Sequence, residues 1–192
     1  MANLDTYKNI TLDMQLAYYA APTMLGIKPA SLFWCRTNID GMHDQVNLFN
    51  EYSKGKGFAI KRIDEGKKHV GIFVYHRSLS EHYLSDASNM SYLQQFGYKL
   101  TLTPEEKLAK LFERMKTSSP HEIGLFLGYP IRDVAGFIEN KGRNYILRGS
   151  WLVYSNPEYA CRLFYHYKLC RNWLVGKIMD GMSIYDVLNI KC

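Results

Sequence analysis

Apolar residues recur at helical spacing along most of this chain, and they alternate with polar residues in only a few short stretches. Such spacing predicts helices over residues 7–20, 40–54, 78–84, 88–96, 103–116, 157–179 and 184–188. The clearest helix start is Thr103-Pro-Glu-Glu106, where a threonine cap, a proline in the first turn and a glutamate three residues later predict a capping box.

Strand patterns are fewer and shorter. Residues 58–63 alternate with period two, residues 69–75 form a second apolar run, and the short glycine-containing stretch between them predicts a β-hairpin. Further strands are expected over 30–35 and 144–154, the latter with Gly149 as a bulge or kink. The segment 21–29 is broken by prolines and a glycine, which favours a packed loop.

The densest passage of the chain is residues 120–142. A serine just before Pro120 can cap a first helix, and Gly128-Tyr-Pro130 ends it, because a residue that precedes proline avoids the α region. A second helix is expected to begin near Ile131 and to stop at Gly142, a favourable left-handed C-cap. The passage therefore predicts two helices joined by a tight turn, with polar residues at the start, the turn and the end.

These elements define the expected fold class. Strands and helices do not alternate regularly, so the pattern predicts an α+β fold with a small, mainly antiparallel sheet packed with several helices. The sheet would contain the hairpin near 58–75 and strands near 30–35 and 144–154. No stretch is rich enough in proline, glycine or serine to be a linker, which predicts a single domain over residues 1–192.

Composition and charge narrow the functional classes. Hydrophobic residues make up 47% of the 192 residues, as in a globular protein, and the net charge of +6 comes from interleaved lysines, arginines and acidic residues. No run of five basic residues occurs, so the charge pattern does not favour nucleic-acid binding. No signal peptide or long apolar run is recognisable, and the four cysteines lack CxxC spacing, which together predict a cytoplasmic protein without a membrane span.

His121 and Glu122 are candidate catalytic residues that adjoin in the sequence, and two interpretations stay open for them. They could form an acid/base or metal-ligand pair, or they could serve the start of the helix through hydrogen bonds and the helix dipole. Adjacent residues of a helix point about 100° apart, and position 125 is leucine, so the HExxH zinc motif is absent.

The other candidates are polar or aromatic residues near helix ends. Asp133 could cap the second helix or accept a hydrogen bond from His121. Asn140 and Lys141 could end that helix, or Lys141 could form an anion site with Arg143 and Asn144. Aromatic residues near by could line a pocket or belong to the core. The candidate ligand-binding residues are Lys28, Tyr129, Asp133, Asn140, Lys141, Tyr145 and Trp151.

Cys35 is the candidate nucleophile of an alternative hypothesis. A thiol nucleophile needs a histidine within reach, and His69, His76 and His121 all follow Cys35 in the chain, which is the chain order of papain-like folds. The same residue is equally well explained as the buried end of a strand.

No metal site is predicted, and the sequence leaves any cofactor unknown. His166 and Cys170 lie four residues apart on the last long helix and could share one face, but aromatic and leucine residues around them favour ordinary packing. Phosphate-binding glycine loops are also missing, since neither GxxxxGK[ST] nor GxGxxG occurs.

Three passages carry a family resemblance. These are Ala-Pro-Thr-Met-Leu-Gly-Ile-Lys-Pro-Ala-Ser-Leu-Phe at 21–33, the long passage from Pro120 to Gly142, and Gly-Ser-Trp-Leu-Val-Tyr at 149–154. They resemble a bacterial family described as a domain of unknown function and found mainly in anaerobic Gram-positive bacteria. The resemblance implies a single-domain cytosolic protein and supplies no activity.

The sequence therefore leaves the function unknown and favours one hypothesis. This is a small-ligand-binding or accessory protein whose functional surface lies around 120–142 and 21–29, with a small molecule or a protein as partner. The alternatives are a cysteine hydrolase that uses Cys35 with a downstream histidine, an acid/base enzyme that uses His121 with Glu122, and a redox- or metal-associated accessory protein of anaerobic metabolism.

Overall fold

The computed structural model describes residues 11–36, 41–65 and 69–189 of the chain. The fold is α+β, as predicted, with a three-stranded antiparallel sheet and a separate two-stranded one. Contacts divide the chain into two compact units, the first made of Met1–Arg77 with Tyr167–Cys192 and the second of Ser78–His166. The expectation of one domain over 1–192 stays a prediction, and each unit is described by itself.

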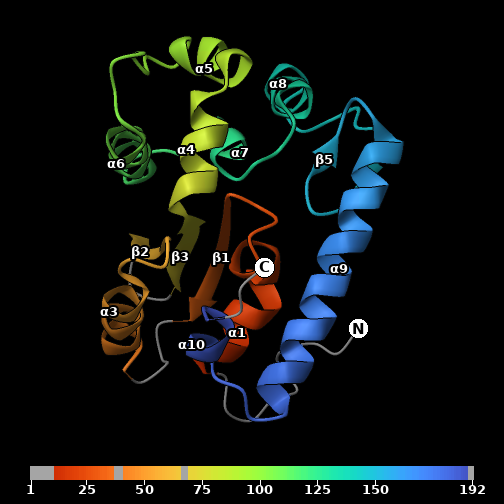
Figure 1. The fold of residues 1–192 in the computed structure, drawn as a ribbon. Helices are drawn as coiled ribbons and strands as arrows, with labels where there is room; N and C mark the ends of the chain where they lie inside the picture. Colours follow the sequence, from red (N-terminus) through yellow and green to blue (C-terminus); the bar gives the residue numbers. More distant parts are fainter. Residues whose placement is uncertain (1–10, 37–40, 66–68, 190–192) are drawn as a thin grey trace. The chain divides into compact units, whose positions relative to one another are not determined.

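The first unit is built on the three-stranded sheet (Figure 1). Its strands are β1 (Ala30–Arg36), β2 (Phe58–Glu65) and β3 (His69–His76), in the order β1-β3-β2. The predicted hairpin is confirmed, because β2 pairs with β3 antiparallel, from Phe58 opposite His76 to Glu65 opposite His69. The strand expected over 30–35 is β1, which pairs with the other edge of β3.

Helices cover one face of this sheet. Alternate residues of the strands, among them Phe33, Ile60 and Ile72, share one buried apolar cluster with residues of five helices. These helices are α1 (Leu12–Tyr19), α2 (Ala21–Met24), α3 (Met42–Ser53), the part of α9 (Pro157–Met179) from Tyr167 onward, and α10 (Ile184–Val187).

Two predictions for the first unit need correction. The first helix begins at Leu12 and is capped by the Thr11 hydroxyl, which accepts from the Met14 N–H; residues 7–10 of the expected helix lie outside the described residues. The segment 21–29, expected as a loop, starts with the helical turn α2, because Pro22 is tolerated in the first turn of a helix, where no N–H is needed.

The second unit is mainly helical. It contains α4 (Arg77–Ser85, from Ser78 onward), α5 (Ala87–Gln94), α6 (Pro104–Met115), α7 (Ile123–Phe126), α8 (Ile131–Glu139) and the part of α9 up to His166. Leucines of α6 such as Leu108 and Leu111 are buried. The Thr103 capping box is confirmed: its hydroxyl accepts from the Glu106 N–H at 3.2 Å, and Glu106 Oε2 accepts from the Thr103 N–H at 2.7 Å.

The first helix of the passage 120–142 is shorter than predicted. Helix α7 begins at Ile123, not at Pro120, and the preceding residues form turns in which N–H groups bond carbonyls three residues earlier, as from Ile123 to Pro120. Neither serine before Pro120 caps it; the Ser118 hydroxyl instead donates to the Arg114 carbonyl at the end of α6. The break before Ile131 is confirmed, and Gly128 there has a φ of +77°.

The stretch 144–154 is a small hairpin and not one continuous strand. Its strands are β4 (Leu147–Arg148) and β5 (Leu152–Val153), and the chain reverses between them. Gly149 lies in this turn against Phe164, and a Cβ atom at position 149 would come within 2.0 Å of that ring. The glycine is therefore required by a close approach to α9, which no alternation pattern reveals.

The capping box generates the first prediction. Replacing Thr103 by alanine removes the hydroxyl acceptor at the start of α6 and is expected to lower the free energy of unfolding by about 1 kcal/mol. Chemical denaturation monitored by circular dichroism measures this difference. Thr101→Ala, at an exposed position just before the cap, is the matched control and is expected to have little effect; equal destabilisation by both variants would contradict the capping role.

Candidate functional site

The candidate site is built on the close packing of α7 against α8. Gly124 in α7 lies so near Val134 in α8 that a Cβ atom at position 124 would be 2.7 Å from Val134 Cγ2. A larger residue would push the two helices apart, because a distance below 3.0 Å between these carbons is not tolerated. The turn between the helices then places Tyr129 beside the hairpin.

Asp133 connects α8 to the hairpin. Its side chain is 3% exposed, and its carboxylate accepts four hydrogen bonds: from Trp151 Nε1 at 2.7 Å, from the Tyr154 and Ser155 backbone N–H groups at 2.9 Å, and from the Ser155 hydroxyl at 2.8 Å. The prediction that Asp133 caps α8 or accepts from His121 is wrong, since α8 has no side-chain cap and the carboxylate is occupied by the hairpin. A buried carboxylate with this many donors is satisfied without any ligand.

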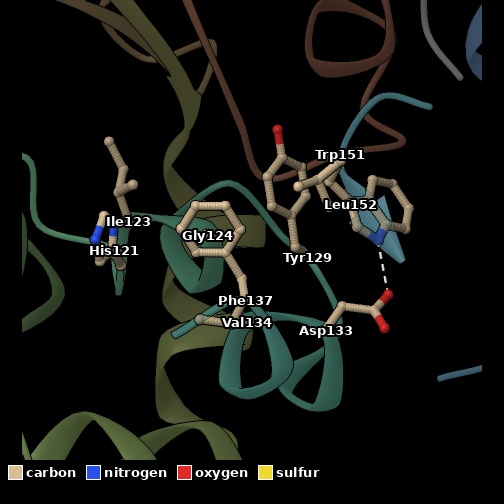
Figure 2. A pocket seen from close by; sticks show the side chains of 9 residues that line it. All are labelled: His121, Ile123, Gly124, Tyr129, Asp133, Val134, Phe137, Trp151 and Leu152. Atoms are coloured by element: carbon tan, nitrogen blue, oxygen red, sulfur yellow. Dashed lines mark hydrogen bonds between the residues drawn. The ribbon is translucent and has the colours of Figure 1, made fainter. Parts of the chain in front are cut away.

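A pocket of about 280 Å³ lies next to this connection (Figure 2). Its walls are mostly aromatic and aliphatic side chains that come from α7, α8, the turn between them and the hairpin. The lining residues are His121, Ile123, Gly124, Tyr129, Asp133, Val134, Phe137, Trp151 and Leu152.

Aromatic contacts fix the walls of this pocket. The rings of Tyr129 and Trp151 are stacked, with centroids 5.0 Å apart and planes 25° apart. Trp151 also meets the ring of Phe164 edge-on at 4.6 Å, while its indole N–H is held by Asp133. Because the indole ring is fixed by both its polar and its apolar contacts, the pocket is preformed.

Tyr129 contributes its ring and not a charge. Its hydroxyl donates to the Ser150 carbonyl over 3.4 Å, and burial raises the pKa of Tyr129 to about 12. The phenol is therefore protonated at neutral pH. Its backbone carbonyl accepts from the Tyr83 hydroxyl at 2.9 Å, which fixes the turn to α4.

His121 lies at the exposed edge of the pocket. Its ring stands edge-on against Phe137, with centroids 5.1 Å apart. Among the residues that the structure describes, neither ring nitrogen of His121 has a hydrogen-bond partner, whereas the carboxylate of Asp133 and the indole N–H of Trp151 bond each other. His121 is therefore the side chain of the pocket best placed to bond a polar group of a ligand.

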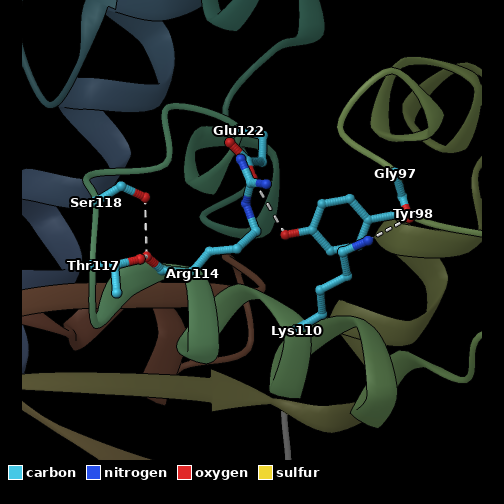
Figure 3. A network of polar contacts seen from close by, with 7 residues as sticks. All are labelled: Gly97, Tyr98, Lys110, Arg114, Thr117, Ser118 and Glu122. Atoms are coloured by element: carbon cyan, nitrogen blue, oxygen red, sulfur yellow. Dashed lines mark hydrogen bonds and ion pairs between the residues drawn. The ribbon is translucent and has the colours of Figure 1, made fainter.

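Glu122 does not share the pocket with His121. It is 1% exposed and forms an ion pair with Arg114, with 2.7 Å between Oε1 and Nε, and it accepts from the Tyr98 hydroxyl at 3.4 Å (Figure 3). Burial and the neighbouring carboxylate raise the pKa of Tyr98 well above its ordinary value, so this phenol stays a donor. The two neighbours in sequence thus have different surroundings, which removes the geometric basis for an acid/base pair.

A family model described as "Protein of unknown function (DUF3793)" matches residues 16–188. The chain belongs to this DUF3793 family. No curated protein and no solved structure matches it. This match confirms the predicted resemblance to a domain of unknown function. The residues that line the pocket all lie within the matched range.

The end of α8 holds two more of the candidates. The Gly142 N–H bonds the Phe137 carbonyl at 3.0 Å and the Lys141 N–H bonds the Ile138 carbonyl at 3.3 Å, which is a Schellman motif. Its left-handed residue is therefore Lys141, with a φ of +52°, and Gly142 follows at +73°. Asn140 Nδ2 donates to the Gly136 carbonyl, so in this DUF3793 protein Asn140 and Lys141 end the helix and do not line the pocket.

The remaining candidates lie outside this pocket. Tyr145 is 42% exposed, and Lys28 belongs to the other unit. Lys28 is buried, its ammonium lies 5.9 Å from the centre of the Tyr167 ring, and burial lowers its pKa to about 8. Their roles in ligand binding stay predictions.

Cys35 has the surroundings of a core residue. Its Sγ donates to the Val70 carbonyl at 3.4 Å within the apolar cluster, and burial raises the pKa of the thiol, opposite to what an activated nucleophile needs. Cys35 pairs with Val70 in the sheet, which places His76 six residues further along β3, about 20 Å away. The proposed pairing of Cys35 with His76 is therefore excluded by the register.

Sequence reasoning missed the aliphatic and phenylalanine walls of the pocket. Val134 and Phe137 lie three residues apart on α8, and this spacing marks one helix face. The pattern alone does not tell whether such a face meets the core or a cavity. Among residues 11–36, 41–65 and 69–189, no group of three or more His, Cys, Asp or Glu side chains could hold a metal ion, and no helix is long and apolar enough to cross a membrane.

The Asp133 connection generates the second prediction. Asp133→Asn keeps the shape of the side chain but replaces one acceptor oxygen by an NH₂ group, which must face either the indole N–H or the donors of residues 154–155. We expect a loss of about 3 kcal/mol in the free energy of unfolding, because buried donors lose their acceptor. Denaturant titration of the variant measures it. Glu139→Gln, on the exposed face of the same helix, should change the stability by less than about 0.5 kcal/mol; a similar loss in both variants would refute the assignment.

The cysteine surroundings generate the third prediction. Cys161 is exposed, whereas Cys35 and Cys170 are buried. Burial raises the pKa of the Cys35 and Cys170 thiols, so a smaller fraction of each is in the reactive thiolate form at neutral pH. Iodoacetamide should therefore modify Cys161 before Cys35 and Cys170, as read by peptide mass spectrometry. In guanidinium chloride the three should react alike. Equal rates for Cys35 and Cys161 in the folded protein would show that Cys35 is an accessible thiol after all.

Proposed function

We propose that this DUF3793 protein binds a small, largely aromatic molecule in the pocket lined by α7, α8 and the hairpin. The observation that carries this proposal is the pocket itself: a cavity of about 280 Å³ whose walls are aromatic and aliphatic and whose indole is held in place by Asp133. Apolar pockets with a few placed polar groups are the usual form of small-molecule sites.

The volume indicates the size of the ligand. A cavity of about 150 Å³ in another protein holds benzene, so by proportion a cavity of 280 Å³ accommodates a molecule of roughly eleven non-hydrogen atoms. A planar bicyclic molecule meets this size, and its faces and edges would find aromatic partners in Phe137 and Trp151.

The polar lining indicates the chemistry of the ligand. Asp133 is saturated by its four donors, Trp151 uses its N–H on Asp133, and Tyr129 is neutral at physiological pH. A charged ligand would lose its hydration without a buried partner of opposite charge in this wall. The pocket therefore suits a neutral molecule with one polar group directed to His121.

Binding is favoured over catalysis by the same geometry. An acid/base mechanism needs two titratable groups aimed at one reacting centre, but Glu122 pairs with Arg114 and Asp133 pairs with the hairpin. The thiol mechanism loses its support because Cys35 is a buried thiol with a raised pKa. No described contact favours the redox- or metal-associated alternative.

We also propose that the protein works in the bacterial cytoplasm. The support is that the described cysteines are free thiols and that Cys161 is exposed, which fits a reducing compartment. The charge pattern of the chain does not favour nucleic acid as a ligand.

Filling the pocket tests the proposal. Indole is the probe, and we expect it to bind the wild-type protein saturably in a calorimetric titration. Leu152→Trp adds a bulky ring at a lining position and is expected to weaken the binding of indole at least about tenfold, a loss of about 1.4 kcal/mol.

Leu100→Trp is the matched control. It adds the same side chain at a position that is 68% exposed in the same unit and is absent from the pocket lining. It should bind indole like the wild type. Wild-type protein that does not bind indole, or a Leu152→Trp variant that binds it unchanged, would each overturn the proposal.

A further inference from the structure

A second cavity, of about 210 Å³, lies in the first unit, apart from the pocket described above. Four segments meet around it: the end of α2 with the turn that follows, the turn before β2, the end of β3, and α10 with the residue after it. It therefore adjoins the segment 21–29, for which the sequence predicted a functional surface.

Five of the residues that line this second cavity have apolar side chains, which form one part of its wall. Met24, Phe58 and Val187 are buried members of the core cluster of the first unit, and Leu25 and Leu188 pack against them. A ligand would therefore gain affinity by burying an apolar body against this wall.

Two side chains give the cavity its polar character. Lys56 lies in the turn before β2, with its ammonium 4.6 Å from the centre of the Tyr52 ring and bonded to Asn189 Oδ1. His76 ends β3; its backbone N–H donates to the Pro29 carbonyl at 2.8 Å, and its ring stands edge-on against Phe58 at 4.6 Å. Lys56 is positioned by residues outside the lining, and the His76 ring is positioned by the lining residue Phe58.

The turn between these groups is shaped by glycine. Gly57 has a φ of +84°, and a Cβ atom at this position would lie 3.5 Å from Cε1 of His76. A Cβ atom at that distance would make only an ordinary contact, so it is the positive φ that favours glycine in this turn, between the lining residues Lys56 and Phe58.

The described lining of this cavity carries no acidic group. Among the residues that the structure describes, none that lines it is an aspartate or a glutamate. The nearby Asp186 of α10 accepts from the Ser183 N–H at 2.9 Å and from the Ser183 hydroxyl at 2.7 Å, which accounts for its carboxylate. An apolar wall with a lysine and a histidine suits a ligand that brings its own anionic group.

We propose that this cavity binds a small monocarboxylate, with its carboxylate at Lys56 and His76 and its apolar body against Phe58 and Val187. By the proportion used above, the volume of 210 Å³ accommodates roughly eight non-hydrogen atoms, which corresponds to a short fatty acid or a monocyclic aromatic acid. Burial lowers the pKa of His76, so the approach of a carboxylate would restore its proton and add to the attraction.

The test uses hexanoate and benzoate as probes of the intact protein. We expect both to bind saturably, and 1-hexanol and benzyl alcohol, which lack the charge, to bind at least about tenfold more weakly. In an amide NMR spectrum of the labelled protein, the signals of Gly26, Gly57 and His76 should shift with the acids. Shifts confined to other residues would overturn the site.

Lys56→Met and Lys54→Met form a matched pair of variants. Both remove one positive charge from the same turn, but Lys54 is exposed, pairs with Glu51 and is not part of the lining. Lys56→Met should weaken the binding of hexanoate about tenfold and Lys54→Met should leave it unchanged. If both variants weakened hexanoate binding equally, Lys56 would act only through the net charge of the protein and not by contact with the carboxylate. That result would overturn the proposal.

Two further measurements distinguish this site from the pocket of the second unit and from a general anion site. Leu152→Trp, which fills the pocket of the second unit, should leave hexanoate binding unchanged, so failure of the indole test does not affect this one. Inorganic phosphate should not displace hexanoate at equal concentration, because it cannot use the apolar wall. Displacement by phosphate as strong as by benzoate would contradict the assignment of a monocarboxylate.

Discussion

The structure of the second unit depends on one buried carboxylate. Asp133 lies in the first turn of α8, where the helix dipole favours an anion, but the N–H groups that stabilise it come from residues 151–155. Moving a carboxylate out of water costs free energy unless buried hydrogen-bond donors replace its hydration. The hydrogen bond to Asp133 fixes the indole of Trp151, and the ring of Tyr129 stacks on this indole. The two rings together form one wall of the pocket.

A second buried carboxylate, that of Glu122, lies eleven positions earlier in the chain and is paired with groups outside the pocket lining. Glu122 is neutralised by Arg114 of α6 and receives the Tyr98 hydroxyl, so its charge does not reach the pocket. With both carboxylates occupied, the space between the helices is lined by rings and methyl groups, and His121 stands at its edge. The proposed preference of the pocket for a neutral molecule rests on the pairing of both carboxylates with protein groups.

Features set by neighbouring residues could be predicted from the sequence, whereas those set by distant residues could not. The Thr103 cap, the hairpin of β2 and β3 and the break at Gly128 each depend on a few adjacent side chains. The partners of Asp133 lie about twenty positions away, and nothing in residues 120–142 specifies them. The candidates chosen as polar or aromatic residues included four residues of the pocket, His121, Tyr129, Asp133 and Trp151. They did not include the aliphatic residues or Phe137, because a helix face turned to a cavity has the same spacing as one turned to the core.

The order of the units along the chain has a consequence for biosynthesis. The second unit is continuous from Ser78 to His166, but the core of the first unit joins residues near the start of the chain to Leu174, Ile184 and Val187 near its end. A ribosome releases these last apolar residues only after the whole second unit has been made. Part of the apolar face of the three-stranded sheet therefore stays uncovered until α10 is synthesised. The unit whose strands are made first is the unit whose core is completed last.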